Sequence, residues 1–150
     1  MNVVIEKMSE RHIEKIASLE KECFSTPWSE NALKEELTNE YARFFTAVCD
    51  GEVCGYIGAH NILGEIYITD IAVFEKYRRK GIGEKLLQKL VSVCEQEQAD
   101  FITLEVRESN AAAVSLYEKA GFKTVGKRKA FYEKPREDAI LMTYKRDGEL

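Results

Sequence analysis

The stretch "EKYRRKGIGEKLLQKL" (residues 75–90) constrains the fold more than any other part of the sequence. It follows "EIYITDIAVF", an apolar-rich segment typical of a strand, and it runs into apolar residues at helical spacing. The spacing predicts a helix from near Gly83 to about Glu97. Because "FITLEV" then reads as a further strand, we expect a right-handed parallel crossover in the middle of the chain.

The remaining segments predict the order β-α-α-β-β-β-α-β-α-β-β. Ser9 and Ser29 are suited to cap the first two helices, the second of which ends at about Leu37. Asp50-Gly51 is typical of a hairpin turn, and Gly121 of the residue that follows a helix. We therefore expect one α+β domain over residues 1–150, with a mixed central β-sheet and helices on both faces.

Composition narrows the class of protein. The chain has 150 residues, a formal net charge of −4 and no stretch as apolar as a membrane span. Because its first residues lack a basic region followed by a long apolar core, we expect no signal peptide. The net charge does not favour general binding to nucleic acid.

The four cysteines form no C-x-x-C pair and only two histidines are present, so we expect no metal site. We expect a cytoplasmic protein with reduced thiols, since a two-residue hairpin would set Cys49 and Cys54 diagonally.

The basic loop has the features of an anion site. The first N–H groups of a helix lack internal partners, and glycine allows a phosphate to approach the backbone. The spacing excludes a P-loop, and Leu86 stands where a dinucleotide fingerprint needs a small residue. The motif that fits is R-x-x-G-x-G, with Arg78, Gly81 and Gly83. Taken alone, this motif also fits a solvated basic turn.

Together with "ITDIAV", the motif resembles the GCN5-related N-acetyltransferase superfamily, and the element order extends the resemblance over nearly the whole chain. The resemblance implies the superfamily's fold and acetyl-CoA as the cofactor. It implies that the pantetheine arm pairs with Ile71, Ala72 and Val73. The pyrophosphate-binding loop is implied to comprise Arg78, Arg79, Lys80, Gly81, Ile82 and Gly83. One departure is Glu75, where relatives often have proline.

Three further stretches resemble the bacterial ribosomal-protein-alanine N-acetyltransferases: "FSTPWSE", "LEVRESNAAAVSLYEKAGF" and "FYEKPREDAILM". This resemblance implies an enzyme that acetylates the α-amine of an N-terminal alanine of a small-subunit ribosomal protein. The implied partners are that N-terminus and acetyl-CoA, without nucleic acid or membrane. The sequence leaves the oligomeric state open, with a monomer favoured.

Glu105 is the candidate general base. Alternation in "FITLEV" puts it on the face opposite Ile102 and Leu104. The alternative is a structural ion pair with Arg107 or Arg136.

Tyr117 is the candidate general acid, since a phenol can protonate a departing thiolate. It lies two helical turns after Asn110, and the resemblance implies that both residues contact the cofactor. A core tyrosine is the alternative reading.

Trp28 and Tyr132 are candidates for contact with the acceptor peptide. The alternative for Trp28 is a place in the core between the first two helices. The acidic and basic residues at 136–138 equally fit a structural ion-pair cluster.

Three other functions remain open at this point. One is acetylation of a lysine or a small-molecule amine, and another is a silent module that binds acyl-CoA. The third is an RNA-binding domain that uses the basic clusters Lys76–Lys80 and Lys123–Lys129. The retained Glu105 and Tyr117 argue against the silent module.

Overall fold

Seven strands in one sheet, four α-helices and two short 3-10 helices make up the computed structural model, which describes residues 1–147. The strands are β1 (Val3–Lys7), β2 (Phe45–Cys49), β3 (Glu52–Ile62), β4 (Glu65–Val73), β5 (Phe101–Arg107), β6 (Lys123–Glu133) and β7 (Arg136–Lys145). The helices are η1 (Glu10–His12), α1 (Ile13–Cys23), α2 (Glu30–Glu36), η2 (Glu75–Tyr77), α3 (Ile82–Gln96) and α4 (Ala111–Lys119). No helix in this part of the chain has the length and apolar character that crossing a bilayer requires.

The sheet has the strand order β1-β2-β3-β4-β5-β7-β6. β4 and β5 run parallel and are connected through α3, and the other neighbouring pairs are antiparallel. The predicted element order and the mixed α+β sheet are both confirmed, and the one parallel pair is the crossover through α3 that the middle of the chain predicts.

The helix after the basic loop buries one face against the sheet. Ile82, Leu86, Leu87 and Leu90 are at most 1% exposed, as their spacing predicts. They share a core with residues of the central strands and with α4. The members from those elements include Ile66, Ile68, Ile102, Leu104, Val106 and Tyr117.

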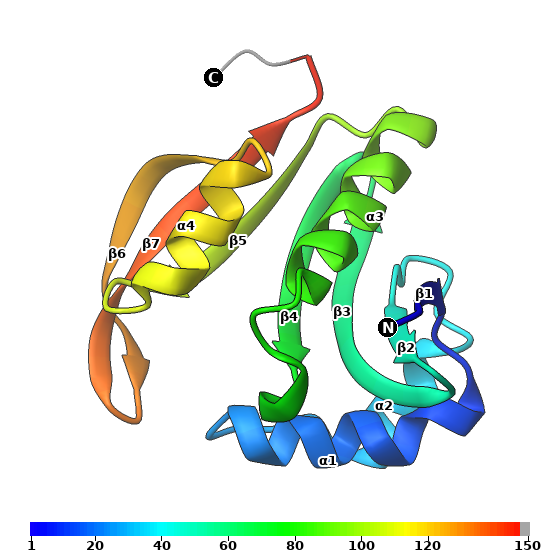
Figure 1. Ribbon diagram of the computed structural model, residues 1–150. Helices are drawn as coiled ribbons and strands as arrows, with labels where there is room; N and C mark the ends of the chain where they lie inside the picture. Colours follow the sequence, from blue (N-terminus) through cyan, green and yellow to red (C-terminus); the bar gives the residue numbers. More distant parts are fainter. Residues whose placement is uncertain (148–150) are drawn as a thin grey trace.

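A second core lies on the opposite face of the sheet, under α1 and α2. It joins residues of the helices to Phe44 and to the strand residues Tyr56 and Ala72. In Figure 1, α1 crosses the lower ends of β3 and β4, while α3 and α4 lie in front of the sheet. Helices therefore cover both faces, and the middle strands lie between two cores.

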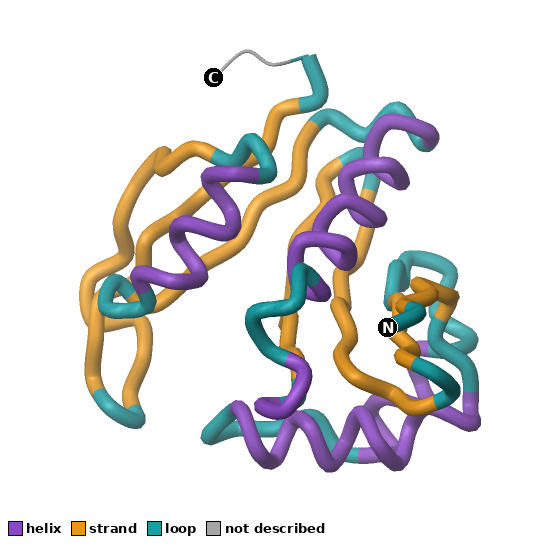
Figure 2. The backbone as a smooth tube through the Cα atoms, viewed as in Figure 1, coloured by secondary structure: helices purple, strands orange, loops and turns teal. Residues whose placement is uncertain are grey.

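β4 and β5 pair over only a short distance. Their register joins Glu65–Tyr67 to Phe101–Thr103, and beyond it the two strands diverge (Figure 2). β4 also bulges at Thr69, since Gly58 pairs with Asp70 while Ala59 pairs with Ile68. The divergence leaves one edge of β4 without a neighbouring strand.

The predicted helix ends agree with the structure. Ser29 caps α2 by accepting a hydrogen bond from the N–H of Ala32 (3.0 Å), and Gly121 follows α4 with a φ of 99°. Ser9 precedes η1, and α1 follows it directly.

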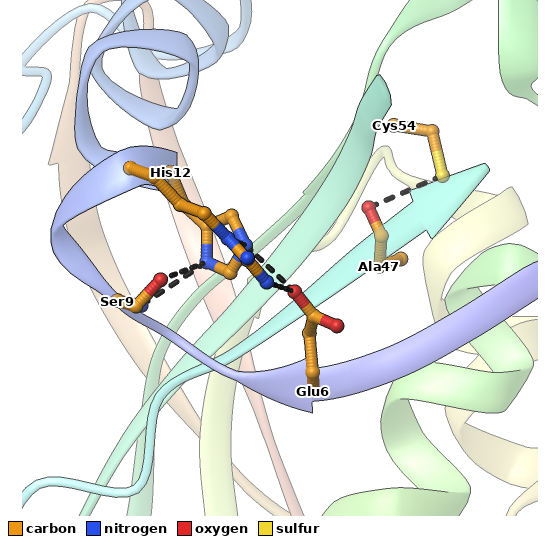
Figure 3. Close-up of polar contacts among 6 residues, drawn as sticks. Glu6, Ser9, His12, Ala47 and Cys54 are labelled. Atoms are coloured by element: carbon orange, nitrogen blue, oxygen red, sulfur yellow. Dashed lines mark hydrogen bonds and ion pairs between the residues drawn. The ribbon is translucent and has the colours of Figure 1, made fainter. Parts of the chain in front are cut away.

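The expectation that Cys49 and Cys54 are free thiols is wrong, because the two residues form a disulfide. A bulge explains the difference: Val48 pairs with Val53 and Ala47 with Gly55, so Cys54 is an extra residue in β3. The bulge brings the Cα atoms of the two cysteines to 6.0 Å, a normal separation for a disulfide. Cys54 Sγ also lies 3.3 Å from the carbonyl oxygen of Ala47 (Figure 3).

A buried histidine connects β1 to α1. His12 is 3% exposed, and its Nε2 lies 2.9 Å from Glu6 Oε1 while the N–H of Ser9 donates to Nδ1 (3.1 Å) (Figure 3). Burial lowers the pKa of His12. These contacts fix the start of α1, the helix that supplies one wall of the site described below.

Replacing Leu90 by alanine should lower the free energy of unfolding by about 2–5 kcal/mol, because it leaves a cavity between α3 and the sheet. Gln88→Ala is the control, since Gln88 is exposed on the same helix. Urea denaturation measures both variants. Equal stability of the two variants would contradict the packing of α3 described here.

Candidate active site

The diverging strands open a cavity of about 1020 Å³. Its walls come from the C-terminal part of β4 (from Tyr67 on), the end of β5, the basic loop, α4, β6 and the segment after α1. Segments that are far apart in sequence thus meet where β4 and β5 stop pairing. In Figure 1, β4 and β5 approach each other near their upper ends and separate below them.

The glycine loop at the start of α3 has an unusual backbone. Arg79 has a φ of 63° and Gly81 a φ of 78°, both in the left-handed region. An added Cβ on Gly81 would meet nothing within 4 Å, so the backbone angle and not crowding requires glycine here. The loop and the first N–H groups of a 15-residue helix meet at the cavity, and such N–H groups are suited to an anion.

The three cations of the loop have different positions. Arg79 lines the cavity and Lys80 does not. Arg78 also lines it, but its side chain is used within the protein: Nε donates to the carbonyl oxygen of Val73 (2.9 Å), and Nη2 lies 3.4 Å from Cys23 Sγ. Arg78 thereby ties the loop to the end of β4 and to α1. Arg79 is the loop arginine that remains for a bound anion.

The free edge of β4 forms a second part of the wall. Ile71, Ala72 and Val73 pair with β3 on one side and line the cavity on the other. Their main chain faces the gap that β5 leaves beyond Thr103. An extended ligand can therefore pair with this edge as an added strand does.

Glu105 lines the cavity from β5, while Ile102, Leu104 and Val106 are buried on the other face, as the alternation predicts. Its Oε1 accepts a hydrogen bond from the hydroxyl of Tyr67 on β4. Burial, this hydrogen bond and the charge of Glu105 raise the pKa of Tyr67, so the phenol stays neutral.

Arg107 was a candidate ion-pair partner for Glu105, but it pairs with Glu137 instead. Arg107 Nη1 lies 3.3 Å from Glu137 Oε1 and 2.8 Å from the carbonyl oxygen of Pro135. Glu137 also accepts from the N–H of Ser109 (2.6 Å). The two acidic residues of segment 136–138 thus have structural contacts, since Asp138 also accepts from the N–H of Ala130 (2.7 Å).

Tyr117 and Asn110 both line the cavity from α4. Tyr117 is 5% exposed and burial raises its pKa, so it carries its proton at neutral pH. Its ring packs 5.7 Å from that of Phe122. Asn110 caps α4 by accepting from the N–H of Ala113 (3.1 Å), which leaves its amide N–H groups for a ligand.

The two residues considered for the acceptor differ in position. Tyr132 lines the cavity from β6, with the guanidinium of Arg107 over its ring at 4.3 Å. Trp28 packs in the second core, its ring 5.6 Å from that of Phe44. Phe24, Ser25 and Thr26 form the cavity wall in its place, so contact between Trp28 and the acceptor stays a prediction.

Two ionisable residues that line the cavity were not predicted from the sequence. Tyr67 reaches Glu105 across the short parallel pairing, and Asp70 lines the cavity beside the fully buried Glu20. The pKa of Asp70 is raised to about 8, mainly by burial and to a smaller extent by Glu20. The sequence held one signal for Asp70: it is an ionisable residue in the middle of the apolar strand "ITDIAV".

This chain matches one protein-family model and several proteins of known name. The family model described as "Acetyltransferase (GNAT) family" matches residues 13–122. The chain is 32% identical to the [ribosomal protein bS18]-alanine N-acetyltransferase of Haemophilus influenzae, covering 93% of this chain and 96% of the relative. It is 41% identical to an N-alpha-acetyltransferase of Sulfurisphaera tokodaii, over 72% of each chain.

Solved structures agree with this assignment. The crystal structure of the ribosomal-protein-S18-alanine N-acetyltransferase from Escherichia coli superimposes with a TM-score of 0.87, at 30% identity, covering 96% of this chain and 94% of the other. This chain belongs to the GNAT family of acetyltransferases.

Proposed function

We propose that this protein transfers the acetyl group of acetyl-CoA to the α-amine of an N-terminal alanine of a small-subunit ribosomal protein. One observation carries the proposal: a single cavity joins the left-handed glycine loop to the carboxylate of Glu105. The names of the bacterial relatives support the acceptor.

The donor end of the cavity fits acetyl-CoA. The loop N–H groups and Arg79 suit a pyrophosphate, and the free edge of β4 suits the amides of a pantetheine arm. When bound, acetyl-CoA supplies a thioester carbonyl and a thiolate leaving group. A main-chain N–H of Ile71, Ala72 or Val73 is assigned to polarise that carbonyl.

Glu105 is assigned to take the proton of the acceptor amine, directly or through water. An α-amine with a pKa of about 7.7–8.0 is roughly 10–15% neutral near pH 7, and a lysine far less. A carboxylate is therefore a sufficient base for an N-terminal amine more readily than for a lysine, because more of the N-terminal amine is already neutral. Tyr67, which donates to Glu105, fixes the orientation of the carboxylate.

Tyr117 is assigned to give its proton to the departing sulfur. The phenol is neutral before the reaction, because burial raises its pKa. As the amine loses one proton to Glu105 and the sulfur gains one from Tyr117, the charges in the site balance.

Two other features agree with this function. The formal charge of −4 favours the approach of a basic ribosomal tail. A cytoplasmic location is proposed as well, since ribosomal proteins are made there. A lysine or small-molecule acceptor is not favoured, because the relatives named above act on N-termini by their names.

The acceptor is tested with peptides that carry an N-terminal alanine and an internal lysine. We expect mass spectrometry to find one acetyl group on the α-amine, and none when the α-amine is blocked beforehand. Acetylation of the lysine in the blocked peptide would contradict the proposal.

Glu105→Gln should lower kcat/KM by about a hundredfold near pH 7, since proton transfer by a positioned base contributes on that scale. The loss should shrink above about pH 9, where most of the α-amine is already neutral. Steady-state rates across pH measure both effects, and full activity at pH 7 would remove Glu105 from its assigned role.

Tyr117→Phe should lower kcat by about a hundredfold while the affinity for acetyl-CoA changes little, because the ring and its packing are kept. Calorimetry with CoA measures the affinity separately from turnover. An unchanged kcat would show that another group protonates the sulfur.

Arg79→Gln should weaken acetyl-CoA binding about tenfold, the scale of one charge-assisted hydrogen bond. Lys80→Gln is the matched control, as it removes the same charge from a neighbour outside the cavity wall. The acceptor KM should not change in either variant. Equal losses for the two would mean that only the net charge of the loop matters.

A further inference from the structure

The turn between β6 and β7 forms a projecting wall of the cavity. β6 is an edge strand of the sheet, and the pairing of β7 with β5 ends at Ala139 and Arg107. Residues 132–137 lie beyond that point, so among the described strands β6 and β7 have only each other as neighbours there. In Figure 1 the turn extends below α4. We call residues 130–137 the hairpin tip.

A bulge in β6 precedes the part of the hairpin tip that lines the cavity. The register of β6 with β7 shifts between Arg128 and Tyr132. Ala130, inside this shift, has a φ of 51°, in the left-handed region. A bulge of this kind bends a strand and changes where its side chains point. Beyond it, the hairpin tip contributes Phe131, Tyr132 and Lys134 to the cavity wall.

Arg107, the last residue of β5, contacts the hairpin tip through its whole guanidinium group. Nη1 donates to the carbonyl oxygen of Pro135 (2.8 Å), and Nη2 donates to that of Lys134 (3.2 Å). The guanidinium also lies over the ring of Tyr132, 4.3 Å from its centroid. Nη1 is 3.3 Å from Glu137 Oε1. One planar cation therefore connects the end of β5 to β6, to the turn and to β7.

The anion that pairs with Arg107 is fixed as well. Glu137 Oε2 accepts a hydrogen bond from the N–H of Ser109 (2.6 Å), the residue before the cap of α4. The side chains of Arg107 and Glu137 are 27% and 18% exposed, so water screens this pair less than it screens a surface ion pair. The hairpin tip is thus tied to β5 and to the start of α4, which both line the cavity.

Arg107 lies on the same face of β5 as Glu105, because alternate residues of a strand point to the same side. Both residues line the cavity. Burial raises the pKa of Tyr132 and the charge of Glu105 adds to this effect, so a neutral phenol lies near the carboxylate. A neutral phenol can donate to or accept from the main chain of a peptide. The end of β5 therefore carries the assigned base and, two positions later, the residue that holds the hairpin tip.

We propose that Arg107 is a positioning residue for the acceptor: it holds the hairpin tip beside Glu105, so that Phe131 and Tyr132 bind the first residues of the acceptor peptide. The use of this wall by the acceptor rests on the proposed function, whereas the connection between Arg107 and the hairpin tip does not. A lysine at position 107 would keep the positive charge near Glu105 but lack the planar fork that reaches two carbonyl groups and covers a ring. Arg107→Lys should therefore loosen the hairpin tip without removing a charge from the site.

The first test needs no substrate. Hydrogen–deuterium exchange of peptic fragments that cover residues 130–137 measures how firmly the hairpin tip is held. We expect Arg107→Lys to speed the exchange in these fragments about tenfold, the scale of one hydrogen bond to a charged group. Equal exchange in the wild type and in Arg107→Lys would overturn the proposal.

Arg43→Lys is the matched control. Arg43 also holds two carbonyl oxygens and a carboxylate, those of Glu40, Ala42 and Glu97, and it lies outside the cavity wall. The control therefore removes the same kind of fork elsewhere in the protein. It should leave the exchange of residues 130–137 as it is in the wild type, and faster exchange there would show a general loss of stability in place of a specific connection.

The second test separates the acceptor from the donor. Arg107→Lys should raise the KM for a peptide with an N-terminal alanine about tenfold, while kcat and the affinity for CoA stay near their wild-type values. Arg43→Lys should keep all three values. An unchanged acceptor KM would contradict the proposal, and so would a shifted pH dependence of kcat, since Arg107 would then act on Glu105 directly.

A third measurement uses the wild type alone, so it does not depend on the folding of a variant. Binding of the peptide to the CoA complex should slow exchange in residues 130–137 compared with CoA alone. A wild type that acetylates the peptide without this protection would overturn the proposal and leave the proposed function intact. A wild type that acetylates no N-terminal alanine would overturn the proposed function together with the acceptor role of the wall, and the first test would still decide whether Arg107 holds the hairpin tip.

Discussion

The short parallel pairing between β4 and β5 is the constraint on which the rest of the molecule depends. Three residue pairs hold the strands together, and past Tyr67 and Thr103 each strand continues against its other neighbour. Because α3 and α4 are held by a continuous core beneath the gap, the strands can diverge without collapse of the sheet. An unpaired strand edge is usually a liability. Here the edge lines a cavity, and its unpaired N–H and C=O groups are available to an extended ligand.

The two sides of this opening present different chemical groups. The glycine loop and the free edge of β4 offer backbone N–H groups, which suit an anionic donor with amide groups along its length. The other face presents Glu105, Tyr67 and Asp70, of which Tyr67 and Asp70 have raised pKa values. Neutral phenols around two carboxyl groups make a site that can hold and move protons near neutral pH.

Much of this arrangement could be predicted from local pattern. The basic loop, the capped helices and the face on which Glu105 lies follow from spacing and alternation, which are properties of neighbouring residues. The disulfide could not be predicted in this way, because it depends on which residue of β3 is left out of the pairing with β2. The same limit applies to Asp70 and Glu20, which are 50 positions apart in sequence and meet only through the packing of α1 on β4. Trp28 lies behind the cavity wall for a related reason, since its backbone N–H donates to Glu20 and its ring packs on Phe44.

The contacts of Arg78 determine which substitutions in the basic loop the cavity can tolerate during evolution. Its guanidinium is fixed by Val73 and Cys23, so the shape of the loop is secured by one arginine and the charge it offers comes from the next. A lysine at position 78 would keep the charge but lose the fork that reaches both partners. Under the proposed function, variation at position 79 would therefore change how strongly acetyl-CoA is held while the contacts of Arg78 stay intact. Variation at position 78 would instead remove a contact of the basic loop with the end of β4 and one with the end of α1, and so would change two walls of the cavity at once.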